Sequence, residues 1–125
     1  MPQKILIVED DRDILGLLKD LLEDEGYEVC ALEHTDSITG NIQQYQPDLV
    51  MLDFLLSGIN GGELCHEIKA NPETAWLPVI MHSAYPRVLD SLGNYGFDAF
   101  LAKPFDVEVV LRTIRDCLES RMAQA

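Results

Sequence analysis

Two apolar stretches that run directly into acidic residues constrain this chain most. The first is Leu49–Leu52, which is followed at once by Asp53; the second is Lys4–Val8, which is followed by Glu9, Asp10 and Asp11. Uninterrupted apolar runs of this length are typical of strands buried on both faces, as in a parallel sheet. A carboxylate at the end of such a strand is costly to bury unless it is paired or bound to metal. We therefore expect both strand ends to share one acidic pocket that holds a divalent cation.

Length and charge narrow the class of protein. A chain of 125 residues is predicted to form one domain over residues 1–125, with 121–125 as a tail or linker stub. Its net charge of −13, from 22 acidic and 9 basic side chains, argues against contact with nucleic acid or an anionic membrane. Three widely spaced cysteines and the absence of a signal-peptide pattern at the first residues predict a cytoplasmic protein.

Strands and helices are predicted to alternate along the chain. The strands are expected at Lys4–Val8, Tyr27–Leu32, Leu49–Leu52, Leu77–His82 and Phe97–Leu101. The helices are expected at about Asp13–Glu25, from a cap at Thr35 or Asp36 to Tyr45, and at about Glu63–Ala70, Pro86–Asn94 and Val107–Met122. Right-handed crossovers then produce an α/β fold, a five-stranded doubly wound parallel sheet with helices on both faces.

The residues that follow the strands are the candidates for function, since ligands of open α/β sheets bind beyond the carboxyl ends of the strands. In chain order these residues are Glu9, Asp10, Asp11, Asp53, Ser83, Ala84, Lys103 and Pro104. A carboxylate can act as a nucleophile towards a phosphoryl group. The charge on the phosphoryl oxygens then needs Mg²⁺, a lysine and hydrogen-bond donors. The combination predicts Mg²⁺-assisted phosphoryl chemistry on a carboxylate.

With these residues in view, the chain resembles the response-regulator receiver domains of two-component signalling, the chemotaxis receivers among them. The similarity extends over essentially all 125 residues. The segments that carry it are Ile5–Asp11, Pro47–Asp53, Asn60-Gly61, Pro78–Ala84 and Lys103–Phe105. The resemblance implies the flavodoxin-like strand order 2-1-3-4-5.

The resemblance also implies roles for individual residues. Asp53 would be the phosphoacceptor, and Lys103 would bind a phosphoryl oxygen, with a cis peptide bond before Pro104. The metal ligands would be Asp10 directly, Glu9 through water, Asp53 itself and the backbone carbonyl of Leu55. The switch residues would be Ser83 and Phe100. Access to the site would pass small Ala84 and bulky Tyr85, and Leu55 and Tyr85 are expected to slow hydrolysis of the phosphorylated form.

The family's biology supplies the remaining expectations. The cofactor would be Mg²⁺, with Mn²⁺ as a substitute, and the phosphoryl donor would be a histidine kinase or a histidine phosphotransfer protein. The signal would pass to a partner or output domain through the fourth helix, fifth strand and fifth helix. The protein would be a switch rather than an enzyme, limited to self-catalysed phosphotransfer and slow autodephosphorylation. The sequence leaves the kinase, the output, the oligomeric state and the presence of further domains open.

Particular residues argue against the alternative functions. A phosphohydrolase or mutase on a similar sheet would need an aspartate two residues after the nucleophile, where this chain has Leu55. A binding module without phosphorylation has no need for the full set of Asp10, Asp53, Ser83 and Lys103. A flavin-binding sheet is disfavoured because Glu9–Asp11 would repel a phosphate. His82 could be a phosphohistidine or a metal ligand, but a histidine on a buried strand is more often a core residue.

Overall fold

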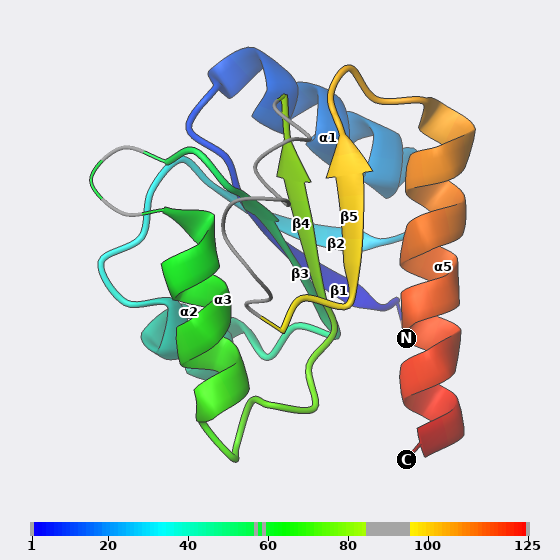
Figure 1. Ribbon diagram of the computed structural model, residues 1–125. Helices are drawn as coiled ribbons and strands as arrows, with labels where there is room; N and C mark the ends of the chain where they lie inside the picture. The colour runs from blue at the N-terminus through cyan, green and yellow to red at the C-terminus, as the bar shows by residue number, and fades with distance from the viewer. Residues whose placement is uncertain (1, 57, 59, 85–95, 125) are drawn as a thin grey trace.

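The computed structural model describes residues 2–56, 58, 60–84 and 96–124, excluding the side chains of 121–124. Five parallel strands form one sheet in the order β2-β1-β3-β4-β5. Their bounds are β1 Lys4–Val8, β2 Glu28–Leu32, β3 Leu49–Asp53, β4 Val79–Ser83 and β5 Ala99–Ala102. The arrowheads of Figure 1 therefore point the same way, and all five carboxyl ends lie at one edge of the sheet. The predicted fold class and strand order are confirmed.

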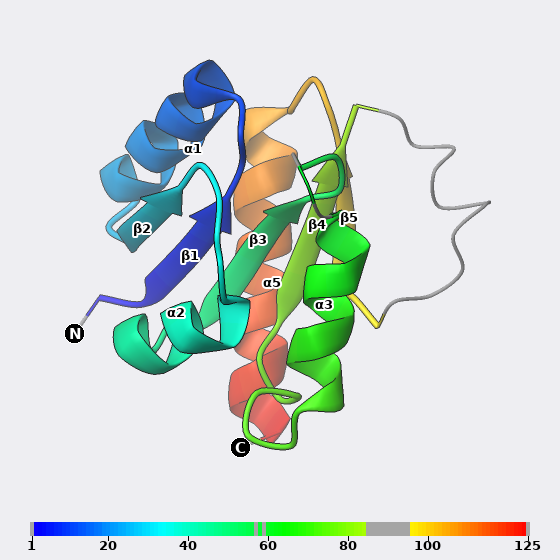
Figure 2. The same cartoon turned by 90° about the vertical axis from the view of Figure 1, so that its left-hand side faces the viewer.

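Helices cover both faces of this sheet. Helices α2 (Ile38–Tyr45) and α3 (Gly61–Ala70) lie on one face, and α1 (Arg12–Asp24) and α5 (Val107–Gln124) lie on the other (Figure 2). The α2/α3 face packs against alternate strand residues such as Val8 and Leu52. The α1/α5 face packs against the intervening ones, such as Ile7 and Met51. This alternation explains why β1 and β3 are apolar at every position: successive side chains enter opposite cores.

The interior strands β1, β3 and β4 are almost entirely buried, whereas β2, which the sequence predicts at an edge, is not. Every residue of β3 is buried, including its last residue, Asp53. Strand β2 at the edge is only partly buried, which fits its less apolar sequence. Asp53 therefore ends a strand that has neighbours on both sides, and the sheet rather than a loop fixes its position.

Several predicted boundaries are wrong by one or two residues. Strand β4 begins at Val79 and not at Leu77, because the Leu77 N–H donates to Thr74 in a turn and Pro78 has no N–H. Strand β5 begins at Ala99 and not at Phe97; just before it, an Asp98 carboxylate oxygen accepts the Val79 N–H at 2.8 Å.

The helix ends differ in a similar way. The N-cap of α2 is Ser37, whose hydroxyl accepts the Gly40 N–H, so a cap at Thr35 or Asp36 is wrong. Helix α5 continues to Gln124, two residues past its predicted end. The predicted helix Pro86–Asn94 lies outside the described residues. Among the helices that are described, none is long and apolar enough to cross a membrane.

Candidate functional site

The two predicted acidic strand ends meet at the carboxyl edge of the sheet. Glu9 follows β1 and is fully buried, and its N–H donates to the Leu32 carbonyl, which extends the pairing of β1 with β2 by one residue. Asp53 ends β3, which lies between β1 and β4. The sheet therefore holds two carboxylates side by side in an environment with little water.

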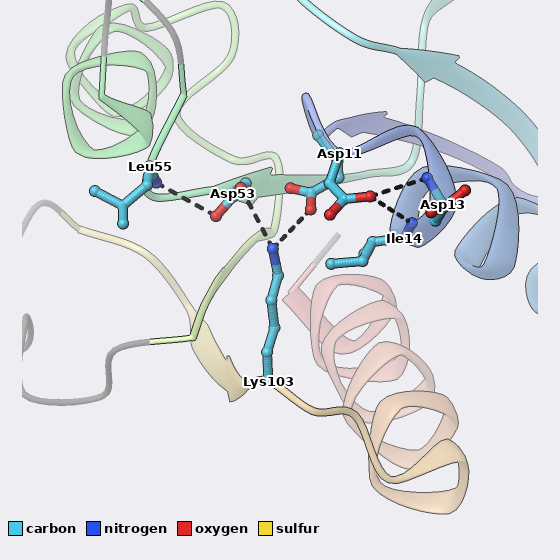
Figure 3. Close-up of polar contacts among 7 residues, drawn as sticks. Asp11, Asp13, Ile14, Asp53, Leu55 and Lys103 are labelled. Atoms are coloured by element: carbon cyan, nitrogen blue, oxygen red, sulfur yellow. Dashed lines mark hydrogen bonds and ion pairs between the residues drawn. The ribbon is translucent and has the colours of Figure 1, made fainter.

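Lys103, which directly follows β5, forms ion pairs with both carboxylates. Its ammonium lies 2.6 Å from Glu9 Oε1 and 3.3 Å from Asp53 Oδ2, and its side chain is 12% exposed. Figure 3 shows this ammonium pointing at Asp53, while the other Asp53 oxygen, Oδ1, accepts the Leu55 N–H at 3.3 Å. The peptide bond from Lys103 to Pro104 is cis, as the family resemblance implies. The single positive charge of the Lys103 ammonium thus faces two buried carboxyl groups.

The protonation of Glu9 follows from this imbalance. Burial raises the pKa of the Glu9 carboxyl to about 8, and the adjacent Asp53 carboxylate adds to the rise. The Lys103 ammonium acts in the opposite direction without cancelling it. Without a metal ion, Glu9 therefore holds a proton at neutral pH. A divalent cation would replace that proton and supply the missing positive charge.

Gly61 allows helix α3 to begin directly against Asp53. A Cβ atom at this position would lie 2.2 Å from the Asp53 carbonyl oxygen, and the Gly61 N–H donates to the Phe54 carbonyl at 2.8 Å. Asn60 caps the helix by accepting the Glu63 N–H at 2.8 Å. The sequence identifies the turn at Asn60-Gly61, but the close approach that makes Gly61 necessary appears only in three dimensions.

His82 lies beside the same carboxylates. It pairs in register with Asp53 across β3 and β4, is fully buried, and packs edge-on against Phe105 with ring centroids 5.5 Å apart. Burial lowers its pKa to about 3, and the Lys103 charge adds to the shift, so the imidazole is neutral. One ring nitrogen, a Glu9 oxygen and an Asp53 oxygen lie within 4.8 Å of one another. His82 is the core residue that the sequence favours, and it also borders the site.

The other predicted site residues differ in how deeply they are buried. Ser83 is buried at the end of β4, and its carbonyl accepts the Lys103 N–H at 2.9 Å. Asp10 and Ala84 are exposed, and Phe100 is half-buried with its ring centroid 6.3 Å from that of Phe97. Leu55 is 48% exposed beside Asp53.

Two further candidates of the sequence, Asp11 and Tyr85, are not part of the pocket that the structure describes. Asp11, a candidate for function in the sequence, caps α1 by accepting hydrogen bonds from the N–H groups of Asp13 and Ile14 at 2.9 and 3.2 Å. Tyr85, the predicted access residue, lies outside the described residues.

The residues at this pocket suit a hard divalent cation. Buried Glu9 and Asp53 supply carboxylate oxygens, and once Glu9 is ionised its Oε2 has no hydrogen-bond donor among the residues that the structure describes. A buried oxygen without a donor is costly, and a metal ion or an ordered water would satisfy it. The donor set therefore fits the Mg²⁺ that the sequence predicts.

A parallel sheet in the order 2-1-3-4-5, with an acidic residue directly after β1, another as the last residue of β3 and a lysine directly after β5, defines a receiver-type fold. The model of the response regulator receiver domain family matches residues 5–115. The chain belongs to this family.

Three known proteins illustrate the similarity. The DNA-binding dual master transcriptional regulator RpaA of Synechocystis is 38% identical over an alignment of 128 positions, and this alignment covers 98% of this chain and 52% of RpaA. A CheY-like receiver domain protein of Methanospirillum hungatei is 28% identical, with a TM-score of 0.90 and full coverage of both chains.

The third is the Thermotoga maritima response regulator TrrA in complex with Mg²⁺ and BeF, which is 28% identical with a TM-score of 0.83. The two structures align over 92% of this chain and 98% of TrrA. The chain spans about half the length of the curated relatives it matches.

Proposed function

We propose that this receiver domain is a phosphorylation switch in which Asp53 accepts a phosphoryl group from a phosphohistidine. The observation that supports this most is the position of Asp53, a buried carboxylate 3.3 Å from the Lys103 ammonium at the open edge of the sheet. An Asp53 oxygen would attack phosphorus and form a P–O bond as the P–N bond of the donor breaks. The leaving imidazole would then take up a proton.

The residues around Asp53 have separate tasks in this proposal. Lys103 would transfer its contact from the Asp53 carboxylate to a phosphoryl oxygen and so stabilise the added charge. The Ser83 hydroxyl and the Phe100 ring would then change position, which alters the surface formed by β5 and α5. The phosphoryl group would thus shift the domain between two pre-existing states.

The metal in this proposal is Mg²⁺, with Mn²⁺ as a substitute. Glu9, Asp10, Asp53 and the Leu55 backbone carbonyl would hold it, and when bound it would neutralise charge on the phosphoryl oxygens. The Mg²⁺ in the TrrA complex supports this assignment. Leu55 is exposed next to Asp53 and would hinder water, so we expect slow autodephosphorylation.

The partners follow from the same chemistry. A cytoplasmic histidine kinase or phosphotransfer protein would supply the phosphoryl group. The downstream partner or output domain would bind the surface of β5, α5 and residues 86–94, where the sequence predicts the fourth helix. The relatives' names support transcriptional output from a longer protein, since RpaA is a DNA-binding regulator.

The test is the intact mass of the protein after incubation with acetyl phosphate, with and without Mg²⁺. We expect a gain of one phosphoryl group that requires both Mg²⁺ and Asp53. Asp53→Ala should abolish the gain in mass. Asp20→Ala, the same change at an exposed position of α1, should retain it. A gain that persists in Asp53→Ala would refute the assignment. Failure with acetyl phosphate and with a phosphohistidine donor would refute the proposed function.

A further inference from the structure

The edge of the sheet opposite the acidic pocket carries a hollow of about 420 Å³. It lies where β4 and β5 begin, between the turn that precedes β4 and the second half of α5. Figure 1 shows this edge at the tails of the strand arrows, whereas Asp53 lies at the carboxyl end of β3. The side chains that line the hollow include Trp76, Asp98, Asp116 and Cys117. An aromatic ring and two carboxylates therefore share one opening, far from the phosphorylation chemistry.

Trp76 is the largest apolar group of this hollow, and its position is fixed. It is 50% exposed, and its indole Nε1–H donates to the Glu73 carbonyl at 2.7 Å, which holds one edge of the ring. Trp76 also borders a second hollow of about 370 Å³, whose lining includes Asp48 and Glu73. An oriented tryptophan that remains half-exposed loses little conformational freedom when a partner covers it, and such residues often dominate binding energies.

Negative charge is in excess around the first hollow. Lys69 supplies a cation, but its ammonium already pairs with Asp98 at 2.9 Å and donates to two backbone carbonyls at 3.2 and 2.7 Å. Asp116 is exposed and forms no ion pair within the described part of the chain. Burial raises the pKa of the Cys117 thiol, and the Asp98 and Asp116 carboxylates add to the rise, so both charges act on the same wall of the hollow.

We propose that this hollow is a docking site for a basic segment of a partner protein, with an arginine side chain against Trp76 and its guanidinium facing Asp98 and Asp116. A planar guanidinium stacks on an indole ring and forms hydrogen bonds with carboxylates at the same time. A second copy of this chain, with its net charge of −13, would add to the repulsion, as would nucleic acid or an anionic membrane. Because the hollow lies at the other edge of the sheet, a partner would have access to it with or without a phosphoryl group on Asp53.

The experiment uses the fluorescence of Trp76, which is the only tryptophan of the chain and therefore reports directly on this hollow. The probe is acetylated tetra-arginine amide, titrated into the unphosphorylated protein at low ionic strength. We expect a saturable change in the Trp76 emission. Acetylated tetra-citrulline amide keeps the shape without the charge, and spermine keeps the charge without the planar groups. Each should bind at least about fivefold more weakly than the arginine peptide.

Three variants locate the binding. Asp116→Asn should lower the affinity about threefold, as expected for an exposed ion pair, whereas Asp20→Asn, the same change at an exposed position of α1, should leave it unchanged. Trp76→Leu, followed by calorimetry, should lower it about fivefold. The Asp116→Asn result does not depend on the packing of Trp76, so it holds even where Trp76→Leu loses stability. No change in wild-type emission, equal affinities for citrulline peptide or spermine, or equal losses in Asp116→Asn and Asp20→Asn would each overturn the proposal.

Discussion

We expect the affinity for Mg²⁺ to rise steeply between pH 6 and pH 8. The reason is Glu9, whose pKa is raised from 4.5 to about 8 in the metal-free protein by burial and by Asp53. Below pH 8 the folded protein holds a proton on this carboxyl, and a cation must displace it. Above pH 8 the carboxylate is already ionised, so the affinity should level off.

The size of the effect follows from the pKa. With one proton displaced, the apparent binding constant varies as 1/(1 + 10^(8 − pH)), which gives about a fiftyfold rise from pH 6 to pH 8. At pH 7, about nine-tenths of a proton should be released for each Mg²⁺ bound.

Calorimetric titration with Mg²⁺ measures both quantities, because experiments in two buffers with different ionisation enthalpies count the released protons. Glu9→Gln is the control: it keeps the shape of the side chain but has no proton to lose, so its Mg²⁺ affinity should be weaker and nearly independent of pH. An equal pH dependence in wild type and Glu9→Gln, or none in wild type, would refute the reasoning.

Two further predictions concern stability and are measured as free energies of urea unfolding. Gly61→Ala should cost about 1–3 kcal/mol because its Cβ would overlap the Asp53 carbonyl, whereas Gly16→Ala, on an open part of α1, should gain up to about 1 kcal/mol. Similar values for the two variants would contradict the close packing of α3. Ile114→Ala should cost about 2–5 kcal/mol as a buried residue of α5, and exposed Val109→Ala should stay within about 0.5 kcal/mol; equal losses would contradict the orientation of α5.

Local boundaries were the least predictable part of the fold. Ser37 caps α2 although Thr35 and Asp36 are also capping residues, and the choice depends on which side-chain oxygen the incoming chain places over the first turn. Likewise, Leu77 is as apolar as a strand residue and is buried, yet its N–H belongs to a turn. Pattern alone does not distinguish such positions, because burial and strand pairing are separate properties.

The sequence by itself determined that the chain forms a parallel sheet and that Glu9, Asp53 and Lys103 lie at the ends of strands. It could do so because an apolar run buried on both faces leaves few alternatives, and because parallel strands bring their carboxyl ends to one edge. The order of the strands came from the family resemblance. Only the tertiary structure decided what these residues meet. Lys103 contacts Glu9 more closely than Asp53, Gly61 touches the Asp53 carbonyl, and His82 faces both carboxylates. These contacts join residues up to 94 positions apart, so they depend on register and side-chain direction, which no local pattern encodes.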